Sequence, residues 1–186
     1  KFQLLNDEIA STEVYSKKYI QIDNEDLFAN KSFRYNLYVV NPMLAGVEYS
    51  KTKAVKIKHH PKILEVVAGG GIISLQQNSQ DKIKDLIMCK VKRGDKIIVP
   101  ANYAISIINT RQNPLIVGEI YCAEARHTYV LDDMGGMAYY IIKKNGKQET
   151  VKNSFYKESP KTRSIKWEEV NKRLNITSKT PIIKQV

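Results

Sequence analysis

Short runs of β-branched and aromatic residues, separated by turn residues, make up most of the chain between residues 35 and 142. Such runs are typical of β-strands, because branched and aromatic side chains pack well on a pleated surface. The runs cover residues 35–40, 47–57, 63–67, 72–76, 83–91, 96–99, 103–108, 115–122 and 137–142. Turn residues separate them, among them Gly69-Gly70-Gly71 and the hairpin signal Asn145-Gly146. Many short strands at regular spacing predict an all-β sandwich or barrel.

The chain has 186 residues, a length that suits one domain with appendages. We expect an N-terminal arm at residues 1–33, a barrel at 34–157 and a basic C-terminal tail at 158–186. Within the tail, Ser164 is a plausible helix cap, and the apolar residues Ile165, Trp167, Val170 and Leu174 follow at helical spacing. The sequence therefore predicts a short helix at 164–175.

The net charge is +11, and it is unevenly distributed. Residues 143–186 carry twelve Lys or Arg and four Glu, a net charge of +8. The positive electrostatic field of such a chain favours polyanionic partners such as nucleic acid. No stretch is long and apolar enough to span a bilayer, and the first residues form no apolar signal core, so we expect a cytoplasmic protein without a membrane partner.

Cys89 and Cys122 are the only cysteines, and both lie in apolar strand-like runs. Their spacing matches no paired motif, so we interpret them as buried free thiols rather than a disulfide or a zinc site. The sequence predicts no cofactor.

Four segments of the expected barrel form a set of recognisable motifs. Residues 99–104 read Val-Pro-Ala-Asn-Tyr-Ala, 121–129 read Tyr-Cys-Ala-Glu-Ala-Arg-His-Thr-Tyr, 34–37 read Arg-Tyr-Asn-Leu, and 46–52 read Gly-Val-Glu-Tyr-Ser-Lys-Thr. Together they resemble the archaeal cupin-type glucose-6-phosphate isomerases, which have Val-Pro-Pro-Tyr-Trp-Ala, Tyr-Pro-Ala-Asp-Ala-Gly-His-Asp-Tyr, Arg-Tyr-Asp-Ile and Gly-x-Glu-x-x-Lys-Thr at these places. The resemblance covers about residues 34–153 and implies a cupin double-stranded β-helix, a jelly-roll barrel.

The resemblance also implies which residues stand where the family holds its metal. Family members bind a divalent metal with two His of a His-x-His strand, a Glu shortly after it and a third His in the Val-Pro motif. This chain has Val55, Ile57, Lys62 and Ile105 at those positions. Aliphatic side chains offer no lone pair, and a Lys ammonium repels a cation. We therefore expect the barrel to hold no metal and no catalytic residue. The chain would be an enzyme only if other residues supplied the metal or the base that isomerisation needs.

A shifted alignment would instead use His59 and His60 as ligands. Alternate residues of a strand share a face, so Val55 and Ile57 are expected to point inward together. Adjacent residues face opposite sides, so His59 and His60 cannot both enter one barrel without a bulge. We prefer the alignment in which the His ligands are lost.

Thr52, Tyr121, His127 and Tyr129 match family positions near the sugar-phosphate pocket, which implies a vestigial ligand site. The alternative is that these Tyr and His side chains pack and satisfy one hydrogen bond each. Glu65 is the only carboxylate that we place near this site, and we interpret it as a solvated or hydrogen-bonded strand residue.

A dense basic run lies between Lys51 and Lys62. If Val55 and Ile57 face inward, Lys56 must face the outer wall, where lysines commonly stay solvated and protect sheet edges. Taken with the basic tail, the run favours contacts to nucleic-acid phosphates. The candidate contacts are Lys51, Lys53, Lys56, Lys58, Lys62, Lys161, Arg163, Lys166, Lys172, Arg173, Lys179 and Lys184.

Three functions stay open at this point. The preferred interpretation is a non-catalytic cupin that acts as a structural or binding protein on RNA or a ribonucleoprotein such as the ribosome. The second is a sugar-phosphate-binding protein or a residual glucose-6-phosphate isomerase. The third is a homodimeric protein–protein scaffold, because cupins commonly pair through sheet edges.

Overall fold

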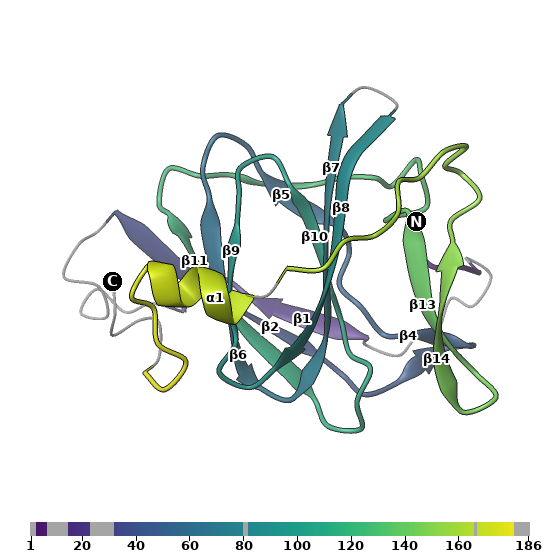
Figure 1. Cartoon of the computed structure of the whole chain (residues 1–186), viewed down its shortest axis with the longest axis horizontal. Coiled ribbons are helices and arrows are strands. Elements are labelled where there is room, and N and C mark those ends of the chain that lie inside the picture. Colours follow the sequence, from purple (N-terminus) through teal and green to yellow (C-terminus); the bar gives the residue numbers. More distant parts are fainter. Residues whose placement is uncertain (1–2, 7–14, 23–31, 80–81, 166, 181–186) are drawn as a thin grey trace.

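The computed structural model describes residues 3–6, 15–22, 32–79, 82–165 and 167–180 (Figure 1). The elements are almost all strands, as the sequence predicts. In chain order they are β1 Ser16–Tyr19, β2 Phe33–Val40, β3 Leu44–Ala45, β4 Glu48–Tyr49, β5 Val55–Ile57, β6 Lys62–Ala68, β7 Gly70–Ser79, β8 Lys82–Lys92, β9 Lys96–Val99, β10 Ala104–Ile108, β11 Leu115–Cys122, β12 His127–Tyr129, β13 Tyr139–Lys144, β14 Lys147–Lys152 and α1 Trp167–Arg173.

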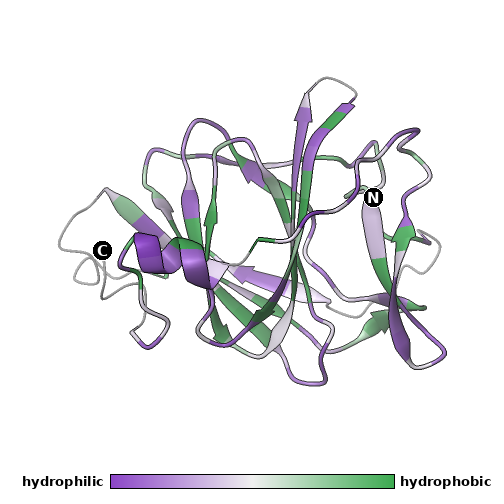
Figure 2. Ribbon diagram, in the orientation of Figure 1, coloured by the Kyte–Doolittle hydropathy of each residue, from purple (hydrophilic) through white to green (hydrophobic). Residues whose placement is uncertain are grey.

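Two five-stranded sheets form the barrel, with strand orders β1-β2-β11-β6-β9 and β12-β5-β10-β7-β8. A smaller sheet, β14-β13-β4-β3, lies at one end (Figure 1). Both large sheets contribute side chains to one buried core, among them Leu64 and Val117 from the first and Ile73 and Ile105 from the second. Figure 2 shows hydrophobic residues along the barrel strands. Alternation along each strand explains this core, because every second side chain points inward.

The prediction of one continuous strand at 47–57 is wrong, because the structure has two separate strands in this range, β4 and β5. The chain leaves β4, which pairs with β13, and then enters β5, which pairs with β10 and β12 in another sheet. Between the two strands, the backbone N–H of Thr52 donates to the carbonyl of Ile107 at 2.9 Å. The apolar pattern continues across this crossing, so the sequence alone does not reveal the change of sheet.

The hairpin prediction at Asn145-Gly146 is confirmed. These residues join β13 to β14 with φ angles of 50° and 75°, the left-handed values that such a tight turn requires. The prediction of a turn over Gly69-Gly70-Gly71 holds only for Gly69, since Gly70 and Gly71 already belong to β7. A Cβ on Gly71 would lie 2.2 Å from the Ile108 carbonyl oxygen, so glycine is needed there for close strand approach.

The C-terminal helix forms where predicted but is shorter, Trp167–Arg173. It lies against β9, where the side-chain amide of Asn171 donates to the Lys96 carbonyl at 2.8 Å (Figure 1). No helix in the described part of the chain has the length and apolar character needed to cross a membrane.

The predicted arm contains β1, which pairs antiparallel with β2. The division of the chain into arm, barrel and tail stays a prediction.

Candidate functional site

The four positions that the family resemblance assigns to metal ligands all lie in the barrel interior. Val55, Ile57 and Lys62 are each 2% exposed and Ile105 is fully buried. Val55 and Ile105 are direct partners across the β5–β10 ladder. The expected inward orientation of Val55 and Ile57 is confirmed, and aliphatic side chains fill this part of the interior.

Lys62 forms a buried ion pair with Glu119 on β11. Its Nζ lies 2.8 Å from Glu119 Oε1, and the two side chains are 1% and 0% exposed. This corrects the prediction of Lys62 as a nucleic-acid contact, because a buried ammonium that is already paired cannot reach a phosphate. The physical reason is parity: Lys62 shares the inward face of β6 with Leu64 and Val66.

The second oxygen of Glu119, Oε2, accepts several further hydrogen bonds. The donors are the Asn36 side-chain amide at 2.8 Å and the Tyr38 hydroxyl at 3.0 Å, and the Nε2 of His127 lies 2.9 Å away. Lys18 on β1 adds a more distant positive charge, with its Nζ 3.9 Å from the same oxygen. We call Glu119, Lys62, His127, Asn36, Tyr38 and Lys18 the Glu119 cluster.

The electrostatics of the cluster favour an ionised Glu119. Burial by itself raises the pKa of this carboxyl, but the charge of Lys62, the hydrogen bond from His127 and the charge of Lys18 outweigh it and leave the pKa well below its ordinary value. Conversely, burial and the neighbouring Glu119 carboxylate raise the pKa of Tyr38 well above the normal range. Glu119 is therefore an ionised carboxylate that its hydrogen-bonding and charged neighbours hold in one position.

A small cavity opens between the two large sheets, lined by their edge strands β1 and β12 and by the neighbouring β2 and β5. Its volume is about 160 Å³, and its walls are Ser16, Lys17, Lys18, Tyr38, Thr52, Lys53, Val55 and Tyr129. We call it the mouth cavity. Lys18 and Tyr38 belong both to its wall and to the Glu119 cluster, so the two features are continuous.

The structure separates the four residues of the predicted sugar-phosphate pocket into two pairs. Thr52 and Tyr129 line the mouth cavity. Tyr121 and His127 lie in the interior, where their rings meet edge to face at a centroid distance of 4.5 Å and His127 contacts Glu119. The Thr52 hydroxyl already has a protein partner, because its oxygen accepts a hydrogen bond from the Ile107 N–H at 3.0 Å.

Glu119 was missed by the sequence analysis, which took Glu65 as the only carboxylate near the site. Glu65 lies on the opposite face of β6, 7% exposed, with its Oε1 3.2 Å from Lys96 Nζ. Of the two alternatives in the prediction, a solvated residue is wrong, because Glu65 is buried and forms an ion pair with Lys96. The signal for Glu119 was its position in β11, where Leu115, Val117 and Tyr121 share its inward face.

The predicted basic stripe is also only partly present. Lys51 is half-buried, forms an ion pair with Glu48 and lies 4.5 Å from the Tyr140 ring centre, so its prediction as a free nucleic-acid contact is wrong. Arg163 pairs with Asp85, its Nε 2.7 Å from Oδ1. Besides Lys51, the candidates that are exposed or half-buried on the surface are Lys53, Lys56, Lys58, Lys161, Arg163, Lys172, Arg173 and Lys179. Lys166 and Lys184 lie outside the described residues.

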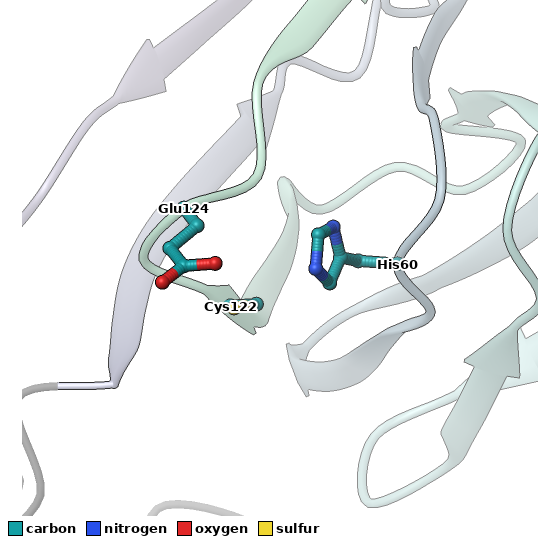
Figure 3. A group of neighbouring side chains, drawn as sticks. All are labelled: His60, Cys122 and Glu124. Atoms are coloured by element: carbon teal, nitrogen blue, oxygen red, sulfur yellow. The ribbon is translucent and has the colours of Figure 1, made fainter.

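The shifted alignment with His59 and His60 as interior ligands fails. His59 is exposed with a left-handed φ of 67°, and His60 lies at the rim of the barrel near Cys122 and Glu124 (Figure 3). Cys89 is buried as expected, and Trp167 Nε1 donates to its sulfur at 2.9 Å. Cys122 is only half-buried.

A family model described as glucose-6-phosphate isomerase (GPI) matches residues 2–158. The chain belongs to this family. The match confirms the resemblance drawn from the motifs, and it extends beyond them into the predicted arm. No curated protein matches the chain closely enough to count as a relative.

Solved structures support the cupin fold. The oxalate decarboxylase of Lactobacillus farciminis, in its formate complex, is 15% identical with a TM-score of 0.50, covering 92% of this chain and 39% of that chain. A deletion mutant of Bacillus subtilis oxalate decarboxylase is 16% identical with a TM-score of 0.50, covering 66% of this chain and 30% of that one. A putative sugar phosphate isomerase from Acidithiobacillus ferrooxidans is 15% identical with a TM-score of 0.40, covering 70% and 74%.

At these identities the likeness concerns the fold alone. The expected cupin double-stranded β-helix is confirmed, and family membership brings sugar-phosphate isomerases as its relatives. The chain spans well under half the length of either oxalate decarboxylase.

Proposed function

We propose that this chain is a metal-free member of its family that binds a small phosphorylated ligand at the mouth cavity without isomerising it. The buried Lys62–Glu119 pair carries the proposal, because it stands where the family resemblance places a metal-ligating carboxylate. An internal ammonium supplies positive charge to the barrel in place of a metal ion.

Electrostatic repulsion argues against a metal beside Lys62. The Lys62 ammonium taken alone would repel a divalent cation about 4 Å away by about 8 kcal/mol at an effective dielectric constant of about 20, and the Glu119 carboxylate that offsets this charge is already engaged by Lys62. Glu119 is the carboxylate within reach, but its Oε1 already faces Lys62 Nζ at 2.8 Å and its Oε2 faces three further polar groups. Few lone pairs of the Glu119 carboxylate therefore remain to coordinate a metal.

The same contacts make Glu119 a poor base for isomerisation. A general base works best when its pKa lies near the working pH and when it can reach the proton that it removes. Glu119 has a lowered pKa and is fully buried. Proton transfer from a sugar carbon would require both the pKa and the packing to change.

The mouth cavity suits the anionic end of a ligand. Lys17, Lys18 and Lys53 contribute positive charge to its wall, and Tyr129, 58% exposed, offers a hydroxyl. Carboxylates offset part of this charge, with Asp132 Oδ1 4.0 Å from Lys53 Nζ and Glu119 Oε2 3.9 Å from Lys18 Nζ. Lys18 is the better anchor because its side chain is 16% exposed, against 42% for Lys53, so water and salt screen its charge less. A volume of about 160 Å³ fits a phosphate group with part of a sugar rather than a drug-sized ligand.

Calorimetric titration with glucose 6-phosphate, glucose and inorganic phosphate tests the binding. We expect the phosphorylated sugar to bind and glucose not to bind. Lys18→Met should weaken binding about tenfold or more, the typical effect of losing a hydrogen bond to a charged group. The matched control Lys56→Met removes a lysine of β5 that does not line the cavity and should bind normally. Equal binding by both variants, or no binding by the wild type, would overturn this part of the proposal.

A coupled isomerase assay tests the absence of turnover. Wild-type chain incubated with Mn²⁺, Fe²⁺, Ni²⁺ or Zn²⁺ should show no isomerisation of fructose 6-phosphate. The variant Val55→His/Ile57→His/Lys62→Glu/Ile105→His restores the family ligand set and should gain bound Mn²⁺. Metal-dependent turnover by the wild type would show that the barrel still performs the family's chemistry.

A second candidate function, RNA binding, has support from a groove between the β8–β9 turn and α1. Its volume is about 640 Å³, and Lys90, Lys92, Arg93 and Lys172 line it together with the aromatic ring of Trp167. Glu168, whose Oε1 lies 3.8 Å from Lys92 Nζ, offsets part of this charge. Cations beside an aromatic ring are the elements with which proteins bind single-stranded nucleic acid. Lys90, Lys92 and Arg93 were not among the sequence candidates.

Fluorescence anisotropy with single-stranded RNA at several salt concentrations tests this candidate. Replacing Lys92, Arg93 and Lys172 by Gln should reduce the slope of log affinity against log salt by about 2, because each phosphate contact contributes about 0.7. The control replaces Lys143, Lys144 and Lys147, which lie at the exposed β13–β14 hairpin, and makes the same charge change. Equal slopes for the two triple variants would exclude the groove.

A further inference from the structure

A second group of metal-ligand side chains lies at the rim of the barrel, apart from the Glu119 cluster. A ring nitrogen of His60, the Sγ of Cys122 and a carboxylate oxygen of Glu124 all lie within 4.8 Å of one another. His60 belongs to the loop between β5 and β6, whereas Cys122 ends β11 and Glu124 follows in the next turn. Figure 3 shows the three side chains converging from these two segments. We call them the rim cluster.

The backbone on both sides holds the rim cluster in place. The N–H of His60 donates to the Lys58 carbonyl at 2.9 Å, and the left-handed His59 precedes it. Across the gap, the N–H of Ala125 donates to the Cys122 carbonyl at 2.9 Å and closes a tight turn around Glu124. The positions of the ligands therefore follow from two defined turns.

The rim cluster contains a buried polar atom that no described residue satisfies. Nδ1 of His60 is buried and has no hydrogen-bond partner in the described part of the chain. Leaving a buried polar atom unsatisfied destabilises a fold, so a ligand at this nitrogen would remove that cost. Cys122 is a free thiol. A bound cation would use one imidazole nitrogen and leave the other to a water or protein acceptor, which is the usual arrangement of metal-bound histidine.

We propose that His60, Cys122 and Glu124 bind a Zn²⁺ ion at the barrel rim. Sulfur, imidazole and carboxylate together match the ligand preferences of Zn²⁺ better than those of Mg²⁺ or Ca²⁺, which prefer oxygen. Ligand atoms around tetrahedral Zn²⁺ lie about 3.3–3.8 Å apart, given bond lengths of about 2.0–2.3 Å. The three ligand atoms already lie within 4.8 Å of one another, and Glu124 is on the exposed side of the group, where its side chain can adjust.

Three protein ligands leave a fourth position for water or an external donor. The ion would also tie the β5–β6 loop to the turn between β11 and β12, because its ligands come from both. This site is independent of the metal position inside the family barrel. It uses none of Val55, Ile57, Lys62 or Ile105, and it does not depend on the proposed function.

Metal titration of the metal-stripped full chain tests the site. We expect one Zn²⁺ per chain in competition with a chromophoric chelator, and Co²⁺ should give a near-ultraviolet thiolate-to-metal absorption band. Cys122→Ser and His60→Gln should each lower the Zn²⁺ affinity about a hundredfold or more, since even loss of a residue that only supports a ligand costs 10–100-fold. Cys89→Ser and His59→Gln are matched controls, and both should keep wild-type affinity.

Glu124→Gln provides a third variant at an exposed position, where loss of folding is not expected. Circular dichroism checks the fold of each variant. Wild-type affinity no tighter than that of the Cys122→Ser/His60→Gln double variant, or a Co²⁺ spectrum without a thiolate band, would overturn the proposal. Metal retained in Cys122→Ser but lost in His127→Gln would instead lie in the barrel beside Glu119 and contradict the metal-free barrel, so the two proposals fail separately.

Discussion

Glu119 joins residues that are far apart in the sequence. Its carboxylate meets Lys18, Asn36, Lys62 and His127, which come from β1, β2, β6 and β12. No local pattern predicts these partners. The alternation of β11 predicts that Glu119 points inward, but only the closed barrel shows that Lys62 compensates its charge. The inward orientation of Val55 and Ile57 was predictable because the alternation of side chains along a strand is a local pattern.

Glu119→Gln should destabilise the protein. The substitution leaves the Lys62 ammonium buried without a counter-charge, which costs about 3–5 kcal/mol. Urea unfolding followed by the fluorescence of Trp167, the only tryptophan, measures the loss. Glu149→Gln, at an exposed position of β14, is the control and should change stability by less than about 0.5 kcal/mol. A Glu119→Gln variant as stable as this control would contradict the charge compensation.

The lowered pKa of Glu119 also predicts a pH dependence. Because the folded pKa lies below the ordinary value of 4.5, the ionised carboxylate stabilises the fold fully above that pH, and this contribution falls as the pH drops toward the folded value. The stability difference between wild type and Glu119→Gln should therefore narrow by about 1.4 kcal/mol per pH unit below about 4.5. Urea midpoints from pH 7 to pH 3 give the measurement. A constant difference over that range would mean that the pKa is not lowered.

At the scale of elements, the sequence predicted most strands but not their assignment to sheets. β9 and β11 have the predicted bounds, since each is a compact apolar run. β12, His127–Tyr129, was missed because three mixed residues carry no recognisable alternation. The C-terminal helix was located from its apolar spacing, and its docking depends on contacts such as that of Trp167 with Cys89, which connect distant segments.

The segment before α1 is attached to β8 through Arg163. Its backbone N–H donates to the Leu86 carbonyl at 3.0 Å, and its side chain pairs with Asp85. The hydrogen bond from Arg163 lowers the pKa of Asp85 to about 2, so the pair should persist at neutral pH and weaken only as the pH falls from about 4 toward 2.

Asp85→Asn should loosen this attachment. We expect faster tryptic cleavage within residues 157–173 at pH 7, because protease attacks segments that detach transiently. Asp133→Asn, an exposed change in another loop, is the matched control. Cleavage rates followed by mass spectrometry give the answer, and identical rates for both variants would mean that Asp85 does not hold the tail.

At the scale of the whole molecule, the C-terminal tail completes the surface of the barrel. α1 contacts β9, and Trp167 and Ile165 pack on the main core. A chain ending at Lys157 should therefore unfold at a temperature about 5 °C or more below that of the full chain. Differential scanning calorimetry compares the two, and an unchanged temperature would show that the tail does not stabilise the barrel.

The oligomeric state belongs to the same scale, and the homodimer stays a prediction. Light scattering of the full chain measures its mass in solution. If the tail were an exchanged arm, the chain ending at Lys157 would change from dimer to monomer. RNA association likewise stays a proposal, and it now rests on the groove beside α1 rather than on the outer wall of β5.

Anomalous diffraction from crystals grown with Mn²⁺ shows whether the Lys62–Glu119 pair stands in place of the family's metal. We expect no anomalous peak in the barrel interior, and we expect Lys62 Nζ to lie within hydrogen-bond distance of Glu119. A Mn²⁺ peak bound to Glu119 and His127, with Lys62 turned away, would contradict this expectation.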